Sequence, residues 1–200
     1  MAVKSSLKNM VLCLTVICLV CSALLGGVYH ITKDGIAAAA EKKLNTAIGC
    51  VVPEYDTCEA PETVSVDGKS YICYRVFKNG EFAGCAVKSS ASGFGGALDI
   101  MVGFTPDGII YNTSVLSCSE TPGLGAKCTD TTSTFVHQFQ GLNPENTSLK
   151  VKKDGGDLDA ITASTITSRA YTEAVVTAVK VFGALTEESV QNANGGTDNE

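Results

Sequence analysis

The stretch that organises this chain reads D-A-I-T-A-S-T-I-T-S, from Asp159 to Ser168. Five of its last seven residues carry hydroxyl groups, and no charged residue lies between Asp159 and Arg169. Alanine, valine and phenylalanine then recur at helical spacing over residues 170–185, which predicts a helix. The hydroxyl run therefore falls at a helix N-terminus, where unpaired N–H groups and the helix dipole favour an anion. The residues alone leave two interpretations open, which are ordinary N-capping and phosphate binding.

Upstream of this run, the chain alternates between strand patterns and tight turns. Residues 70–78 and 81–88 flank Asn79-Gly80, the strongest short hairpin signal. Residues 97–104 and 109–117 flank the turn Thr105 to Gly108. Two successive hairpins predict an antiparallel meander and not a doubly wound sheet, so the fold class is α+β.

Two glycine-bearing loops border these strands. Ser92-Gly93-Phe94-Gly95-Gly96 leads into a strand, so it is not a dinucleotide-binding fingerprint, which opens a helix. Ser119-Glu120-Thr121-Pro122-Gly123-Leu124-Gly125 follows the last hairpin. Its Pro122-Gly123 pair is a turn by itself, and its glycines would let backbone N–H groups approach a ligand closely. We expect Glu120 to hold a loop in place and not to transfer protons.

Between the second loop and the hydroxyl run, weaker patterns predict three elements. Residues 129–140 are expected to form a short helix, 143–146 a turn and 148–152 a strand. His137 has no second histidine nearby, so it is expected to be an ordinary surface or packing residue. After Leu185 the chain becomes polar, which predicts a flexible tail over 187–200.

The N-terminal region is apolar. Residues 11–28 carry no charge, and Lys4 and Lys8 precede them. This length predicts an uncleaved transmembrane helix over 10–29, with residues 1–9 in the cytoplasm; a cleaved signal peptide is the alternative. Residues 30–58 are expected to form a stalk helix, starting near Asp34-Gly35, and a connector. The main domain, residues 59–186, would then lie outside the membrane.

Composition narrows the function. The net charge of −6 and the absence of a basic stripe argue against nucleic-acid binding. Three of the nine cysteines lie in the apolar segment, and the pairing of Cys50, Cys58, Cys73, Cys85, Cys118 and Cys128 stays open between disulfides and buried thiols. Their spacings match no metal-binding pattern, and we find neither a nucleophile–base pair nor a carboxylate dyad. No catalytic or metal-binding residues are therefore predicted.

The hydroxyl run resembles the flavinylation motif of the FMN-binding domain family, Asp-x-x-Ser/Thr-Gly-Ala-Thr, with Ala163 in place of the usual Gly and Ser164 in place of the usual Ala. The two glycine loops extend the resemblance. It implies an FMN covalently attached to Thr165 by a phosphoester bond, and an apolar ring that Leu124 could cover. The cofactor-binding residues that it implies are Asp159, Thr162, Ala163, Ser164, Thr165, Thr167, Ser168, Gly93, Phe94, Gly95, Glu120, Thr121, Pro122, Gly123, Leu124 and Gly125.

Within that family, the order of anchor, loops and motif is similar to that of the G subunits of Rnf-type ion-translocating electron-transport complexes. It is also similar to that of the C subunits of sodium-pumping NADH:quinone reductases. The resemblance implies an electron relay between ferredoxin and NAD in the bacterial inner membrane, with a single-pass anchor and a periplasmic main domain. It further implies other membrane subunits and a flavin transferase as partners. A non-redox assembly module and a stand-alone flavin reductase are the alternatives.

Overall fold

The computed structural model describes residues 7–194, which fall into two compact units divided between Lys43 and Leu44. Helix α1 (Leu7–Val51) begins in the first unit. It is long and apolar enough to cross a membrane, and every residue from 7 to 43 is exposed. Exposed apolar side chains all round a helix are stable only against lipid or protein. The helix continues through Asp34-Gly35, so the predicted helix start there is wrong.

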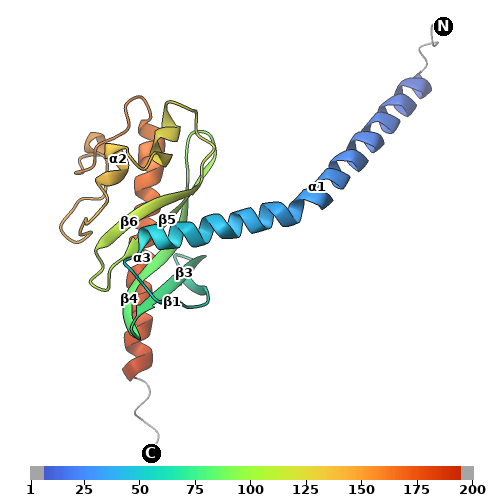
Figure 1. The fold of residues 1–200 in the computed structure, drawn as a ribbon. Coiled ribbons are helices and arrows are strands. Elements are labelled where there is room, and N and C mark those ends of the chain that lie inside the picture. The colour runs from blue at the N-terminus through green and yellow to red at the C-terminus, as the bar shows by residue number, and fades with distance from the viewer. Residues whose placement is uncertain (1–6, 195–200) are drawn as a thin grey trace, which may run out of the picture. The chain divides into compact units, whose positions relative to one another are not determined.

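The second unit is built on one antiparallel sheet (Figure 1). Its strands are β1 (Thr57–Cys58), β2 (Glu62–Val66), β3 (Lys69–Lys78), β4 (Glu81–Ser92), β5 (Ala97–Phe104) and β6 (Ile110–Ser117). They are ordered β1-β3-β4-β5-β6, and β2 also pairs with β3. The predicted meander and the α+β class are confirmed.

Positive-φ turns set the strand register. Asn79 and Gly80 have φ of 52° and 84°, as a type I′ hairpin requires, and they pair Lys78 with Glu81. Asp67 and Gly68, at 52° and 75°, do the same between β2 and β3. This first hairpin was not predicted, although Asp-Gly is an equally strong turn signal.

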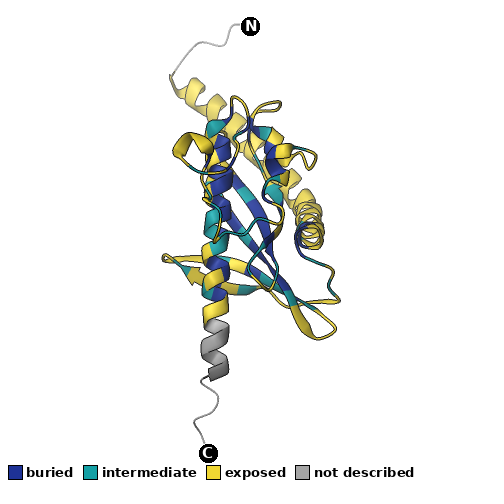
Figure 2. Ribbon diagram, turned by 90° about the vertical axis from the view of Figure 1, so that its left-hand side faces the viewer, coloured by how far each residue is buried: buried dark blue, intermediate teal, exposed yellow. Residues whose placement is uncertain are grey.

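Apolar residues pack on both faces of the sheet. Helix α3 (Thr165–Asn194) lies across one face, and its buried side is turned to the strands (Figure 2). Tyr171 is completely buried in this core and donates a hydrogen bond to Thr113 Oγ1 at 2.7 Å. Residues 47–52 pack on the opposite face against Val76, Ala86 and Met101. Gly103 permits this approach, since a Cβ there would collide with the backbone of Val51.

The segment between β6 and α3 is largely irregular. It contains η1 (Gly125–Thr129), α2 (Thr134–His137) and η2 (Lys152–Asp154). The helix predicted over 129–140 is thus a single turn, capped by Ser133. The strand predicted over 148–152 is wrong, because only an isolated parallel bridge joins Val151 to Leu158. The predicted turn over 143–146 is present.

Helix α3 is longer than predicted at both ends. It begins at Thr165 itself and continues to Asn194. Residues 187–194 are therefore helical where a flexible tail was predicted. Residues 195–200 of that predicted tail, and residues 1–6 of the predicted cytoplasmic segment, lie outside the described residues.

Candidate functional site

The predicted site residues converge on a cavity of about 410 Å³ in the second unit. Three segments far apart in sequence form its wall: the β4–β5 loop, the segment after β6 and the N-terminus of α3. The lining residues are Phe94, Glu120, Thr121, Leu124, Gly125, Ala163, Ser164, Thr165, Ile166 and Thr167. This volume lies in the usual range of small-molecule sites.

Thr165 is the first residue of α3 and is half-buried at the cavity. Its Oγ1 lies 3.3 Å from Nζ of Lys153, which belongs to η2 and donates a hydrogen bond to it. The α3 dipole and this ammonium group both place positive charge at the Thr165 hydroxyl. That arrangement favours a phosphate at this point.

A second hydroxyl fixes the turn that leads into α3. Oγ of Ser168 accepts a hydrogen bond from N of Ile161 at 2.9 Å and donates one to O of Ser164 at 2.9 Å. N of Ser164 donates to O of Ile161, which closes the turn at 3.0 Å. Because Ser168 is completely buried and does not line the cavity, its hydroxyl positions Thr165.

Ala163 has a positive φ of 61°. In this left-handed region a Cβ costs about 1–2 kcal/mol, and glycine avoids the cost. The structure therefore explains the glycine that the motif usually carries here, and it shows that an alanine can occupy the same backbone conformation.

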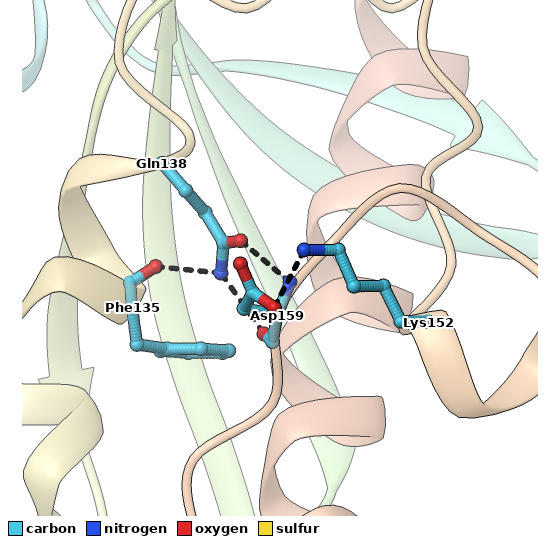
Figure 3. Close-up of polar contacts among 4 residues, drawn as sticks. All are labelled: Phe135, Gln138, Lys152 and Asp159. Atoms are coloured by element: carbon cyan, nitrogen blue, oxygen red, sulfur yellow. Dashed lines mark hydrogen bonds and ion pairs between the residues drawn. The ribbon is translucent and has the colours of Figure 1, made fainter.

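Asp159 does not line the cavity, and its polar contacts are with Lys152 and Gln138 (Figure 3). Its carboxylate accepts a hydrogen bond from Nζ of Lys152 at 2.7 Å, and its side chain is 72% exposed. Its backbone N and O are both bound by the side-chain amide of Gln138, which also donates to O of Phe135. Asp159 thus ties the start of the hydroxyl run to α2.

Glu120 joins the two glycine loops. Its Oε1 accepts hydrogen bonds from N of Phe94 at 2.7 Å and N of Gly95 at 3.3 Å, and the residue is only 8% exposed. These contacts agree with the expected role of Glu120 in holding a loop. A Cβ at Gly93 would collide with Glu120 Oε1, and one at Gly95 with the backbone O of Ser119.

Gly125 also lies against Glu120. A Cβ at this position would come within 2.6 Å of both Glu120 Oε2 and Thr167 Oγ1. Glycine here lets the segment after β6 pack directly on α3. The neighbouring N–H of Leu124 donates a hydrogen bond to O of Thr121 at 3.2 Å, and this bond stabilises the turn.

The cavity gathers exposed apolar side chains. Between residues 44 and 187, six large apolar side chains are exposed, and three of them line this cavity: Phe94 at 71%, Ile166 at 51% and Leu124 at 44%. Exposed apolar surface collected around a cavity is typical of a site that binds a small molecule. The Thr165 end is polar, so the cavity has one polar end and one apolar end.

The structure brings together nine of the sixteen predicted residues at the cavity. The other seven do not line it and lie in the flanking loops and turns or, in the case of Ser168, within α3: Asp159, Thr162, Ser168, Gly93, Gly95, Pro122 and Gly123. Two residues were missed. Ile166 is an unspecified position of the motif, and Lys153 reaches Thr165 only through the folded η2 turn.

A cavity with an apolar rim and a polar end at a helix N-terminus, in a chain that also carries an apolar N-terminal helix, is the arrangement typical of a membrane-associated small-molecule-binding protein. Sequence comparison specifies the class. Residues 93–180 match the FMN-binding domain family, and residues 1–51 match the RnfG N-terminal region.

Several proteins with similar sequences are G subunits of ion-translocating complexes. The chain is 33% identical over 171 residues to the G subunit of the ion-translocating oxidoreductase complex of Vibrio vulnificus, covering 80% of this chain and 81% of that one. It shares 32% sequence identity with the G subunit of the same complex from Aliivibrio fischeri, over 92% of this chain and 94% of that one. It shares 31% sequence identity with the G subunit of the proton-translocating ferredoxin:NAD(+) oxidoreductase complex of Clostridium ljungdahlii, over 86% of this chain and 90% of that one. The chain therefore belongs to the family of G subunits of ion-translocating oxidoreductase (Rnf) complexes.

Among solved structures, the chain is similar to the C subunit of the Na(+)-translocating NADH-quinone reductase from Parabacteroides distasonis. The match has 19% identity and a TM-score of 0.47, over 72% of this chain and 82% of that one.

Proposed function

We propose that this protein carries FMN, attached through a phosphoester bond to Thr165, and relays electrons in a membrane-bound ion-translocating ferredoxin:NAD oxidoreductase complex. The observation that carries the proposal is the position of Thr165. Its hydroxyl lies at the first residue of α3, at the cavity and next to Lys153. The FMN-binding family match supports the cofactor, and the names of the relatives support the complex.

The residues present fit FMN at both ends. Lys153 and the N-terminus of α3 would offset the negative charge of the phosphate. Phe94, Leu124 and Ile166 would cover the apolar ring, and Glu120 keeps the β4–β5 loop where Phe94 can reach it. When bound, the flavin supplies the electron-transfer chemistry, and the protein supplies orientation and electrostatics.

The supporting turns have a separate role in this proposal. Ser168 fixes the backbone of the hydroxyl run, and Asp159 ties the run to α2 through Gln138. Both keep the Thr165 hydroxyl at the cavity without contacting the cofactor. Exposed turns lie next in sequence to the residues that line the cavity in two segments. Pro122 and Gly123 belong to the turn after β6, and Thr162 belongs to the turn before α3.

We further propose that α1 anchors the protein by a single transmembrane pass, with the N-terminus in the cytoplasm and the FMN domain outside. The lysines before the apolar stretch favour this orientation. Other membrane subunits of the complex and a flavin transferase are the expected partners.

A mutant comparison in the native membrane tests the attachment. Trypsin releases residues 154–169 as one peptide, and the wild type should carry the mass of FMN less water on Thr165. Thr165→Ala should lose all flavin that survives denaturation, read by in-gel fluorescence. Thr177→Ala, which removes a hydroxyl from the same helix away from the cavity, should retain it. Flavin covalently bound to Thr165→Ala would refute the assignment.

A further inference from the structure

Two cysteines lie at the base of the segment that lines the cavity. Cys118 directly follows β6, and Cys128 lies in η1. Their Sγ atoms are 3.9 Å apart. The nine residues between them include Glu120, Leu124 and Gly125, all of which line the cavity. A covalent link between the two thiols would therefore close this wall of the cavity into a loop.

We propose that Cys118 and Cys128 form a disulfide bond in the mature protein. The proposal rests on the extracytoplasmic location proposed above, because disulfides persist in oxidising compartments. The Sγ atoms need to approach by about 2 Å to reach the bond length of a disulfide. Rotation of the two side chains supplies such a movement, and Cys118, at the end of a strand and only half-buried, has room to turn.

The bond would form by thiol–disulfide exchange with a disulfide oxidant of that compartment. Cys118 is the accessible thiol, so its thiolate attacks the oxidant and releases one thiol of the oxidant. Cys128 is buried, and burial together with the neighbouring Cys118 raises its pKa to about 12. It therefore acts second and attacks the Cys118 sulfur of the mixed disulfide, releasing the other thiol. Two thiols of this protein lose two protons and two electrons, and the oxidant's disulfide gains them.

The disulfide would restrain the wall that Glu120 already holds by hydrogen bonds. Glu120 fixes the β4–β5 loop to the segment, but nothing covalent fixes the segment's own two ends. Cross-linking the ends of a short loop removes conformations from the unfolded chain and limits the opening of the native loop. The cavity would then keep its shape during changes in flavin charge.

Peptide mapping tests the bond directly. Trypsin cleavage yields a peptide of residues 89–127, in which Cys118 is the only cysteine, and a peptide of residues 128–150, in which Cys128 is the only cysteine. Cys73 and Cys85 lie in two other peptides, residues 70–75 and 79–88. Native membranes are denatured in iodoacetamide without reductant and then digested. We expect the 89–127 and 128–150 peptides to be joined in about nine-tenths or more of the molecules, and to separate on reduction. In Cys118→Ser the joined species should vanish, and Cys128 should become alkylated.

A protease-accessibility assay on spheroplasts separates the two proposals. If Cys118 and Cys128 are both alkylated without reductant in a protein whose domain is digested from outside, the disulfide is refuted and the topology stands. If the domain is protected and both cysteines are alkylated, the topology and the disulfide are both refuted; joined peptides in a protected domain refute the topology alone. A joined peptide in the externally digested protein supports both.

Discussion

The two walls of the cavity differ in how they are built. The Thr165 wall consists of hydroxyl side chains at a helix N-terminus, with Lys153 beside them. The opposite wall consists of glycine-bearing loops around one carboxylate, that of Glu120, with Phe94 and Leu124 exposed. One wall offers a hydroxyl group with a neighbouring positive charge, whereas the other offers exposed apolar side chains on loops that Glu120 holds.

This contrast predicts that the Thr165 wall controls the attachment of the flavin, whereas the Glu120 wall controls the surroundings of the flavin ring. Changes in the Thr165 wall should alter whether and how fast a phosphoester forms. Changes in the Glu120 wall should leave the bond intact and alter what surrounds the ring. A variant that violates this division would show that the walls act as one unit.

The largest effect on stability is expected from Glu120→Ala. The variant leaves N–H groups of Phe94 and Gly95 without their acceptor, and hydrogen bonds to a charged group contribute about 1.5–3 kcal/mol. We expect urea unfolding to show a loss of about 2–4 kcal/mol. Flavin should stay attached, but iodide should quench its fluorescence more strongly because the loop carrying Phe94 is released.

Glu173→Ala provides the control for this variant. Glu173 is exposed on α3, so its loss should change stability by less than about 0.5 kcal/mol and leave quenching unchanged. A folded Glu120→Ala protein that carries no flavin would contradict the division between the walls.

A smaller effect, on the rate of attachment, is expected from Lys153→Gln. Lys153 is exposed, so solvent screens its charge, and such a contact contributes about 0.5–1 kcal/mol. Flavin incorporation by the transferase should therefore slow by about two- to fivefold. Stopped time courses with in-gel fluorescence measure the rate, and the final yield should not change.

Lys152→Gln is the matched control, because Lys152 binds the exposed carboxylate of Asp159 and not Thr165. Its rate should equal that of the wild type. Equal slowing in both variants would indicate a general effect of surface charge and remove the specific role of Lys153.

The strands and the position of Thr165 were predictable from local sequence. Asn79-Gly80 and the alternation over residues 97–104 define a hairpin and a strand by interactions between near neighbours. The hydroxyl run before an apolar 3.6-residue repeat likewise places Thr165 at a helix start. These signals need no knowledge of distant contacts.

The Lys153 contact was not predictable in this way. Residues 118–164 contain few periodic patterns, and the path of the chain depends on the Val151–Leu158 bridge and on the Gln138–Asp159 hydrogen bonds. Both are isolated contacts without a sequence signature. The supporting roles of Ser168 and Asp159 were missed for the same reason, since a motif gives the residue types but not the direction of each side chain.

Ala163→Gly should raise the free energy of unfolding, by less than Glu120→Ala lowers it. At a φ of 61°, glycine removes a steric cost of about 1–2 kcal/mol but adds about 0.4–1 kcal/mol of unfolded-state entropy. The net gain in urea unfolding should be about 0.5–1 kcal/mol. Ala160→Gly, in the same run but without a positive φ, should have the opposite sign. Shifts in the same direction for both variants would exclude backbone strain as the cause.

The smallest effect concerns the outer edge of the Thr165 wall and depends on pH. Arg169 of α3 donates to both carboxylate oxygens of Asp154, which follows Lys153 in η2, at 2.7 and 2.6 Å. These hydrogen bonds lower the pKa of Asp154 below its ordinary value of 3.8. A lowered folded-state pKa contributes stability above pH 3.8 and loses it as the pH falls through the folded-state value. The difference in Tm between the wild type and Asp154→Asn should therefore be constant from about pH 5 to 7 and shrink toward pH 2. Because Asp154 and Arg169 are both exposed, the Tm difference should also shrink in about 1 M salt. A difference that persists in acid would mean that the Asp154 side chain acts through packing, and that the link between η2 and α3 does not depend on its charge.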